Sequence, residues 1–106
     1  MHINRFEVYR ADLEPAKGSE MNKRRPCVVV SPNELNGLAT VIVAPLTSRG
    51  FELQSRVPCT FRGRQGLILL DHLRAVDKMR LGEFLGSVDV ETQQEICETL
   101  QEMFAY

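Results

Sequence analysis

Short apolar runs, separated by polar, Gly and Pro positions, make up most of the sequence and predict β-strands. Residues 6–11 alternate apolar and polar side chains, as expected for a half-buried strand. Three further runs are almost continuous in Val, Ile, Leu and Ala, which is typical of buried strands: 27–30, 40–44 and 67–70. Residues 56–60 predict another strand, which Pro58 places at a sheet edge because proline cannot donate a ladder hydrogen bond. We therefore expect five to seven short strands.

The hydrophobic period changes near the C-terminus and predicts one helix beginning at Asp89. Its apolar face consists of residues at i, i+4, i+7 and i+8, namely Ile96, Leu100, Met103 and Phe104. Asp89 is a suitable N-cap, and Glu91 lies in the first turn, where the helix dipole favours negative charge. Strands followed by one helix predict a mainly β fold with α, a small and partly open β-barrel covered by a C-terminal helix. We interpret residues 1–106 as a single domain.

Two segments between the predicted elements bear on function. Residues 12–24 contain Pro15, Gly18 and many charged side chains, and they predict a loop longer than most connections in a small domain. Loops of this kind often carry function. Asp71 and His72 follow a strong strand and are predicted to continue it, so their side chains should face opposite sides and form no catalytic pair. We therefore expect His72 to be structural.

The charges are unevenly distributed along the chain. Residues 89–106 hold five of the 14 acidic residues and none of the 13 Lys and Arg, so residues 1–88 carry a net charge of +4. This segregation is compatible with nucleic-acid binding, although two solvated faces of opposite charge would look the same. Without a long apolar run or an apolar signal segment, we expect a cytoplasmic protein with no membrane contact. The three widely spaced cysteines predict reduced, structural thiols.

Several residues could perform metal-independent cleavage of RNA. That reaction must remove a proton from the 2′-hydroxyl, stabilise negative charge on phosphorus and protonate the leaving 5′-oxygen. Arg25 begins one strong strand, and Thr47 and Ser48 follow another, so neighbouring strands would bring them to one phosphate. A solvated strand-start arginine and a turn-capping hydroxyl are the plainer interpretations. No spacing typical of metal ligands or phosphate loops occurs, so we expect no metal and no cofactor.

Basic and aromatic residues add weaker support for a nucleic-acid partner. A track of basic side chains would suit phosphates, although an ordinary wet surface would look similar. The members of this basic track are Lys17, Lys23, Arg24, Arg25, Arg49, Arg56, Arg62 and Arg64. Tyr9, Phe51 and Phe61 could stack on bases, but core packing is expected for at least two of them.

Taken together, these motifs resemble the MazF/PemK family of toxin endoribonucleases across nearly the whole chain. The resemblance rests on motifs in a fixed order: Glu7-Val8-Tyr9, Asp12-Leu13-Glu14-Pro15, Lys17-Gly18-Ser19-Glu20, Arg25-Pro26-Cys27-Val28-Val29-Val30-Ser31-Pro32, Pro45-Leu46-Thr47-Ser48 and Gly66 to Asp71. It implies an SH3-like (CcdB/MazF-type) barrel and a homodimer that binds single-stranded RNA. It also implies metal-independent cleavage to 2′,3′-cyclic phosphate and 5′-hydroxyl ends, and a cognate antitoxin whose disordered acidic tail covers the RNA groove.

The resemblance also implies roles for individual residues. Arg25 and Thr47 match the family's catalytic arginine and threonine, and Glu20 matches an acidic position proposed to take part in proton transfer. We expect the RNA to contact Lys17, Ser19, Lys23, Arg24, Ser48, Arg49, Arg56 and Asp71. Two departures stand out. Phe6 replaces a common Gly, and Leu69 replaces an arginine that is the catalytic acid in the plasmid-toxin branch, so Arg25 and Thr47 must carry more of the chemistry.

Two other functions fit parts of the sequence. A toxin of the same fold could bind and poison DNA gyrase without catalysis, using the C-terminal helix and Ala105-Tyr106, but it would not need the Arg25 and Thr47 motifs. A peptide-binding barrel could use its exposed sheet edge. Its binding should ignore salt, whereas RNA binding should weaken steeply as salt rises.

Overall fold

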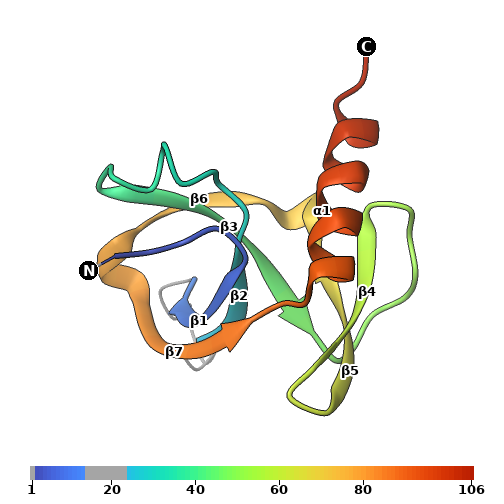
Figure 1. The fold of residues 1–106 in the computed structure, drawn as a ribbon. Helices are drawn as coiled ribbons and strands as arrows, with labels where there is room; N and C mark the ends of the chain where they lie inside the picture. The colour runs from blue at the N-terminus through green and yellow to red at the C-terminus, as the bar shows by residue number, and fades with distance from the viewer. Residues whose placement is uncertain (1, 14–23) are drawn as a thin grey trace, which may run out of the picture.

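The computed structural model describes residues 2–13 and 24–106, which form a curled sheet with one α-helix beside it (Figure 1). The elements of this described part are β1 (Glu7–Asp12), β2 (Arg24–Val29), β3 (Thr40–Thr47), β4 (Arg56–Phe61), β5 (Arg64–Leu69), the 3₁₀ turn η1 (Leu70–His72), β6 (Arg74–Asp77), the 3₁₀ turn η2 (Lys78–Arg80), β7 (Leu81–Ser87) and α1 (Val90–Met103). Across these described residues, no helix is both long and apolar enough to cross a membrane.

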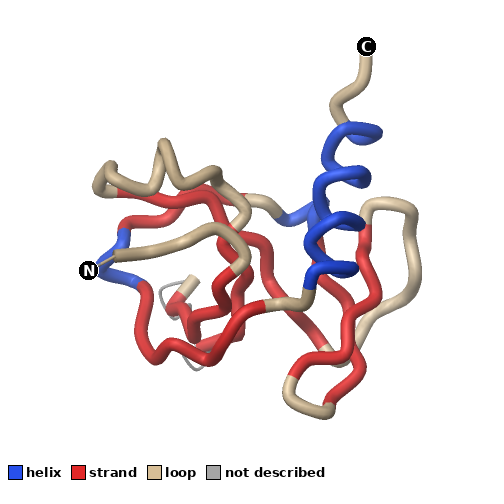
Figure 2. The backbone as a smooth tube through the Cα atoms, in the orientation of Figure 1, coloured by secondary structure: helices blue, strands red, loops and turns tan. Residues whose placement is uncertain are grey.

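The strands form one antiparallel arrangement with the order β4-β5-β3-β2-β1-β7. β3 is the centre of the sheet, because it pairs with β2, with β6 through residues 40–43, and with β5 through residues 46–47. Since β5 and β6 continue in different directions from β3, the sheet curls into a partly closed barrel (Figure 2). β4 lies at one end of the order, as predicted from Pro58.

Two apolar clusters lie on opposite faces of the central strands. One contains Val8, Val28 and Ile96, and it lies between the sheet and α1. The other contains Cys27 and Val29. Because side chains alternate along a strand, burial on both faces explains why residues 27–30 are continuously apolar. The two clusters together fix β2 and β3, the two strands that carry the predicted catalytic residues.

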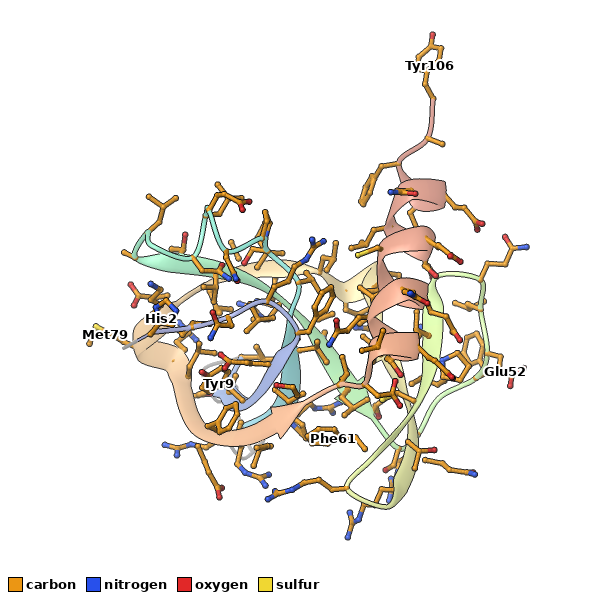
Figure 3. The ribbon with its side chains drawn as sticks, viewed as in Figure 1. His2, Tyr9, Glu52, Phe61, Met79 and Tyr106 are labelled. Atoms are coloured by element: carbon orange, nitrogen blue, oxygen red, sulfur yellow. The ribbon has the colours of Figure 1, made fainter. Side chains whose placement is uncertain are left out.

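The C-terminal helix runs alongside β4, and its predicted start is confirmed (Figure 1). Asp89 is the N-cap, and its Oδ1 accepts a hydrogen bond of 2.8 Å from the Thr92 backbone N–H. Ile96 is fully buried, with Leu100 and Met103 packed against the same cluster. The prediction that Phe104 belongs to this apolar face is wrong, because the helix ends at Met103 and Phe104 is 71% exposed. The chain then leads away from the barrel to Tyr106 (Figure 3).

The sequence pattern did not predict β7 as a strand. Its residues Gly82, Glu83, Gly86 and Ser87 break the apolar alternation, and only Leu81 and Leu85 are buried. The pairing of β7 with β1 contains two register shifts, so Leu81 and Leu85 pack into different clusters although their spacing would place them on one face. β6 is only four residues long, which is too short for a clear period.

Phe6 adopts a left-handed backbone with φ of 73°. This conformation is unfavourable for residues with a Cβ and explains why glycine suits the position. Here the conformation is held on both sides, since the Phe6 N–H donates to the Val29 carbonyl and the Phe6 carbonyl accepts from the Val88 N–H. The ring packs against the first cluster and lies under the Arg5 guanidinium, 4.9 Å from its centroid. Packing therefore offsets the strained backbone.

Candidate functional site

Arg25 and Thr47 come from neighbouring strands, as the sequence predicted. β2 and β3 pair in the register Val29–Val43, Val28–Ala44 and Cys27–Pro45. This pairing ends at Cys27–Pro45, so Arg25 on β2 and Thr47 on β3 each lie two residues beyond the same end of the paired segment. Both residues line one cavity, so a single phosphate there could meet a guanidinium and a hydroxyl together.

The Thr47 side chain is fixed by its own turn. The backbone N–H of Arg49 donates to Thr47 Oγ1 at 3.1 Å. The hydroxyl oxygen thus accepts one hydrogen bond, and its O–H remains able to donate to a ligand. The plainer interpretation of Thr47 as a turn-capping residue is therefore part of the geometry, and it is compatible with a role in binding.

The backbone of Thr47 is held against β5 by a close approach at Gly66. A Cβ added at Gly66 would lie 2.5 Å from the Thr47 carbonyl oxygen and 3.7 Å from the Ser48 Cα. Only glycine permits this spacing, because the neighbouring atoms are backbone and cannot rotate away. Gly66 therefore sets the position of Thr47 and Ser48 relative to β5.

The cavity that contains Arg25 and Thr47 has a volume of about 730 Å³ and is strongly basic. It lies between the β1–β2 side of the barrel and the β4–β5 hairpin, with Thr47, Ser48 and Arg49 between them. Six arginines contribute to the lining: Arg10, Arg24, Arg25, Arg49, Arg62 and Arg64. None of the lining residues in the described part of the chain is acidic. The site is therefore suited to a polyanion, with fixed charges able to bind more than one phosphate.

The structure adds Arg10 to the residues chosen from the sequence. Arg10 lies on β1 opposite Pro26 of β2, between the buried Tyr9 and Ala11. The alternation of β1 could have revealed it, since Arg10 is the polar position that faces away from Tyr9. Its guanidinium lies 3.7 Å from the Glu83 carboxylate, and both side chains are well exposed to solvent. This ion pair is therefore weak and can yield to a stronger ligand.

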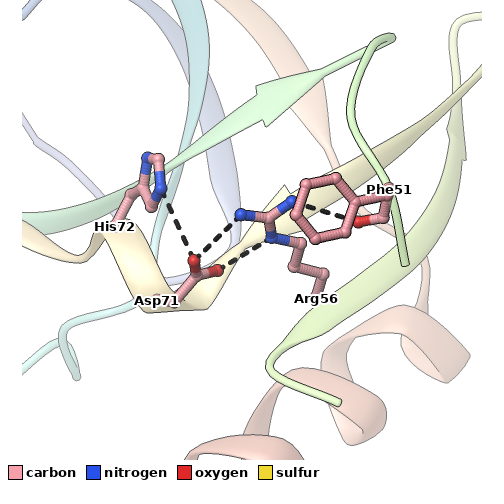
Figure 4. A network of polar contacts seen from close by, with 4 residues as sticks. All are labelled: Phe51, Arg56, Asp71 and His72. Carbon is pink, nitrogen blue, oxygen red and sulfur yellow. Dashed lines mark hydrogen bonds and ion pairs between the residues drawn. The ribbon is translucent and has the colours of Figure 1, made fainter. Parts of the chain in front are cut away.

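Arg56 and Asp71 do not line this cavity but form a separate network (Figure 4). Nε and Nη2 of Arg56 donate to the two carboxylate oxygens of Asp71 at 3.2 and 3.1 Å. Nη1 of Arg56 donates to the Phe51 carbonyl at 3.0 Å, and the guanidinium lies over the Phe51 ring. The hydrogen bonds from Arg56 lower the pKa of Asp71. The Arg56 side chain is only 11% exposed, so these contacts are largely shielded from solvent. Through Phe51 and Asp71 they connect the 48–55 loop to η1.

The separation predicted for Asp71 and His72 is wrong. The two residues lie in the 3₁₀ turn η1 and not on a strand, so their side chains do not alternate. His72 Nε2 lies 3.5 Å from Asp71 Oδ2 (Figure 4). This contact joins His72 to the Arg56 network and places it with residues that position the loop.

Four of the predicted site residues lie outside the described residues: Lys17, Ser19, Glu20 and Lys23. Of the others, Arg24, Arg25, Thr47, Ser48 and Arg49 meet in the cavity. Tyr9 is buried and Phe61 is half-buried, as expected for core aromatics, whereas Phe51 is 68% exposed. In residues 2–13 and 24–106, no three His, Cys, Asp or Glu side chains gather around one point.

The buried thiols and phenol play no part in this cavity. Burial raises the pKa of Cys27 to about 12, so this thiol stays protonated at neutral pH. Burial also raises the pKa of Cys59. The pKa of Tyr9 rises to about 12, first through burial and then through its hydrogen bond to Glu7. None of these three groups lines the cavity, whose polar side chains in the described part of the chain are the six arginines, Thr47, Ser48 and Gln65.

Comparisons with known proteins bear on the family and the fold of this chain. A sequence model of the PemK-like, MazF-like toxins of type II toxin-antitoxin systems matches residues 4–104. The chain is 33% identical over 108 residues to Endoribonuclease EndoA of Bacillus subtilis, which covers 95% of this chain and 93% of that protein. MazF of Deinococcus radiodurans superposes with a TM-score of 0.81 at 26% identity, over 100% of this chain and 99% of that one.

A mycobacterial endoribonuclease, solved in complex with its cognate antitoxin, gives a TM-score of 0.79 at 27% identity, over 94% of this chain and 92% of that one. The predicted fold class, a small MazF-type β-barrel with a C-terminal helix, is confirmed. The family model spans nearly all of the sequence. This chain therefore belongs to the family of PemK-like, MazF-like toxins of type II toxin-antitoxin systems.

Proposed function

We propose that this chain is a toxin that cleaves single-stranded RNA at specific sequences without a metal ion. The observation that carries the proposal is the placement of Arg25 and Thr47 across β2 and β3, both lining one basic cavity. Membership in the toxin family supports it, as does the Bacillus relative, which is named an endoribonuclease. The six arginines of the lining supply fixed positive charge where a metal-dependent nuclease would use a cation.

The proposed reaction is an internal transfer at phosphorus. The RNA 2′-oxygen forms a bond to phosphorus, and the bond from phosphorus to the 5′-oxygen breaks. The products are a 2′,3′-cyclic phosphate and a 5′-hydroxyl. Arg25 stabilises the additional negative charge on the phosphoryl oxygens and can donate a hydrogen bond to the leaving oxygen, but it is no base because guanidinium keeps its protons.

Thr47 supplies the second contact to the phosphate. Its Oγ1 accepts from the Arg49 N–H, and its O–H remains able to donate a hydrogen bond to a phosphate oxygen. Preorganised donors of this kind stabilise a transition state without reorganisation. The proton of the 2′-hydroxyl goes to Glu20 or to water, and the same acid or a water molecule then protonates the leaving 5′-oxygen, so that no net proton is gained or lost. Glu20 lies outside the described residues.

The partners follow from the charge of the cavity. We propose that Arg24, Ser48 and Arg49 bind RNA from the cavity, together with Lys17, Ser19 and Lys23, which lie outside the described residues. Arg56 and Asp71 contribute by holding the 48–55 loop. An acidic, disordered antitoxin segment could neutralise the same arginines by folding onto them. We further propose a homodimer that acts in the cytoplasm, where its RNA substrates occur.

The decisive experiment is cleavage of a defined single-stranded RNA by purified protein in EDTA. We expect fragments with 5′-hydroxyl and 2′,3′-cyclic phosphate ends, and mapping the 5′ ends would give the sequence that is cut. Arg25→Ala should lower kcat by about 10²–10³-fold, the usual cost of one preorganised charge contact. Arg80→Ala is the matched control, because Arg80 is exposed and does not line the cavity.

Full activity of a folded Arg25→Ala protein would refute the catalytic assignment. Loss of cleavage in EDTA with recovery in Mg²⁺ would refute the metal-independent chemistry. If RNA stays intact while the protein captures DNA gyrase, the nuclease proposal fails in favour of a gyrase poison. The partner proposals are tested by light scattering for the dimer, and by co-expression with the product of the neighbouring gene, which should abolish toxicity.

A further inference from the structure

The β4–β5 hairpin ends in an unusual turn. Two residues, Arg62 and Gly63, join the strands after the last pair, Phe61–Arg64. Both have positive φ, 53° for Arg62 and 79° for Gly63, as in a type I′ turn. Gly, Asn and Asp are favoured at the first of these positions, whereas arginine is not. Strain retained at one residue points to a role for its side chain.

The position of the hairpin indicates what the Arg62 side chain could bind. Arg62 and Arg64 line the basic cavity from the side opposite Arg24 and Arg25, with Thr47 between the two sides. Phe61, in the last strand pair before this turn, packs against the first cluster and points toward β7 (Figure 3). A Cβ at Gly86 of β7 would lie only 3.5 Å from the Phe61 ring. The charged turn therefore lies on a hairpin that is packed firmly against the rest of the fold.

The cavity is larger than one phosphate requires. Its volume of about 730 Å³ lies within the range of pockets that enclose a whole small ligand, about 300–1,000 Å³. Arg25 and Thr47 account for one phosphate near β2 and β3. Arg62 and Arg64 carry two more positive charges, and the lining residues described by the structure include no acidic partner for them.

We propose that the tip of the β4–β5 hairpin is a second phosphate-binding subsite for single-stranded RNA. In this subsite, Arg62 and Arg64 bind the backbone phosphate that flanks the scissile one. The proposal rests on the proposed function, because the first phosphate is the one held at Arg25 and Thr47. In this proposal the hairpin positions the RNA and takes no part in bond cleavage.

Arg62→Gly is a sharp test, because glycine accepts the positive φ of this turn and the variant should fold at least as well as the parent. Arg64→Gln removes the second charge, and Arg80→Gln is the matched control outside the cavity lining. RNA cleavage by Arg62→Gly/Arg64→Gln should show a KM raised by about tenfold or more, as expected for the loss of one phosphate contact, with kcat unchanged. Arg25→Ala should instead lower kcat.

Binding to an oligonucleotide with a 2′-deoxy sugar at the cut site, which cannot be cleaved, measures the contact directly. The plot of log K against log salt should be shallower for the double variant by about 0.7, the value for one phosphate contact on a single strand. Neutral methylphosphonate linkages, introduced one at a time, then locate the contact. Neutralising the flanking linkage should weaken binding to the parent protein and leave binding to the double variant unchanged.

An unchanged KM and salt slope in the double variant would overturn the subsite. A double variant that still loses affinity when the flanking linkage is neutralised would overturn it as well. Normal RNA binding with weakened binding of an acidic antitoxin peptide would assign the hairpin to a protein partner instead. If the parent protein cleaves no RNA, the proposed function fails; if it cleaves RNA but ignores the hairpin substitutions, only the subsite fails.

Discussion

Replacing Gly66 by alanine should disturb the proposed catalytic residue without touching it chemically. The added Cβ would lie 2.5 Å from the Thr47 carbonyl oxygen and 3.3 Å from the Thr47 carbonyl carbon, whereas ordinary contact begins at about 3.4 Å. β5 must therefore move from β3 by roughly 1 Å, because both neighbouring atoms are backbone. Gly66 lies on β5 next to Leu67, the residue that pairs with Thr47, so the displacement falls on the Thr47–Ser48 segment itself.

Two effects of known size follow. Overpacking of this kind costs about 1–3 kcal/mol in the free energy of unfolding. A displacement of about 1 Å at a catalytic group can also lower kcat by about 10²-fold. Urea unfolding at one fixed protein concentration measures the first effect, since the stability of a dimer depends on concentration. RNA cleavage well below the melting temperature measures the second.

Gly37→Ala is the matched control for this prediction. A Cβ at Gly37 has no neighbour within 4 Å, and Gly37 is not among the glycines with positive φ. This variant should keep its stability within about 0.5 kcal/mol, as most surface substitutions do, and should retain full activity. A Gly66→Ala protein as stable and as active as the parent would refute the view that the close approach of β5 positions Thr47.

Three further predictions concern the site and the strained positions. Thr47→Val removes the hydroxyl at nearly constant shape and should lower kcat by about 10²–10³-fold, while Thr47→Ser should retain most activity; equal loss in both would reject the hydroxyl's role. In urea unfolding, Phe6→Gly should be more stable than Phe6→Ala by about 1 kcal/mol, because of the positive φ at this residue; the reverse order would contradict the strain. Arg56 lowers the pKa of Asp71 in the folded protein. As the pH falls, the Asp71 carboxylate is therefore protonated at a higher pH in the unfolded chain than in the folded one. Stability should therefore decline below about pH 4, the ordinary range of the carboxyl, and Asp71→Asn should be less stable than the parent at pH 7 but show a shallower decline.

The sequence predicted those parts of the fold in which local pattern and burial agree. Residues 27–29 of β2 and 43–44 of β3 are buried on both faces, so these runs are apolar and their place in the centre could be inferred. The expected burial of the whole run 40–44 is wrong at Ile42, which is 37% exposed. β7 was missed because its register shifts disperse its few buried residues between two clusters. The turn at Asp71 and His72 was missed because a 3₁₀ turn of three residues leaves no period in the sequence.

The site divides in the same way. Arg25 and Thr47 were predicted to lie near each other because short motifs mark the ends of strong strands, and both line the cavity. Arg10 was not selected, because its importance depends on which strands neighbour β1. The role of Gly66 depends on a distance between two backbones, which no pattern of residue types reveals.

The concentration of arginines in one cavity is itself informative about what the fold is built to bind. Like charges repel one another, so six arginines around one cavity oppose folding unless solvent or a ligand screens them. One weak ion pair, between Arg10 and Glu83, offsets a small part of that repulsion. By contrast, Arg56, which lies outside the cavity, is fully engaged by Asp71 and the Phe51 carbonyl. The fold thus pairs the arginine that supports a loop and leaves charge concentrated where Thr47 presents its hydroxyl, an arrangement whose electrostatic cost is relieved when a polyanion binds.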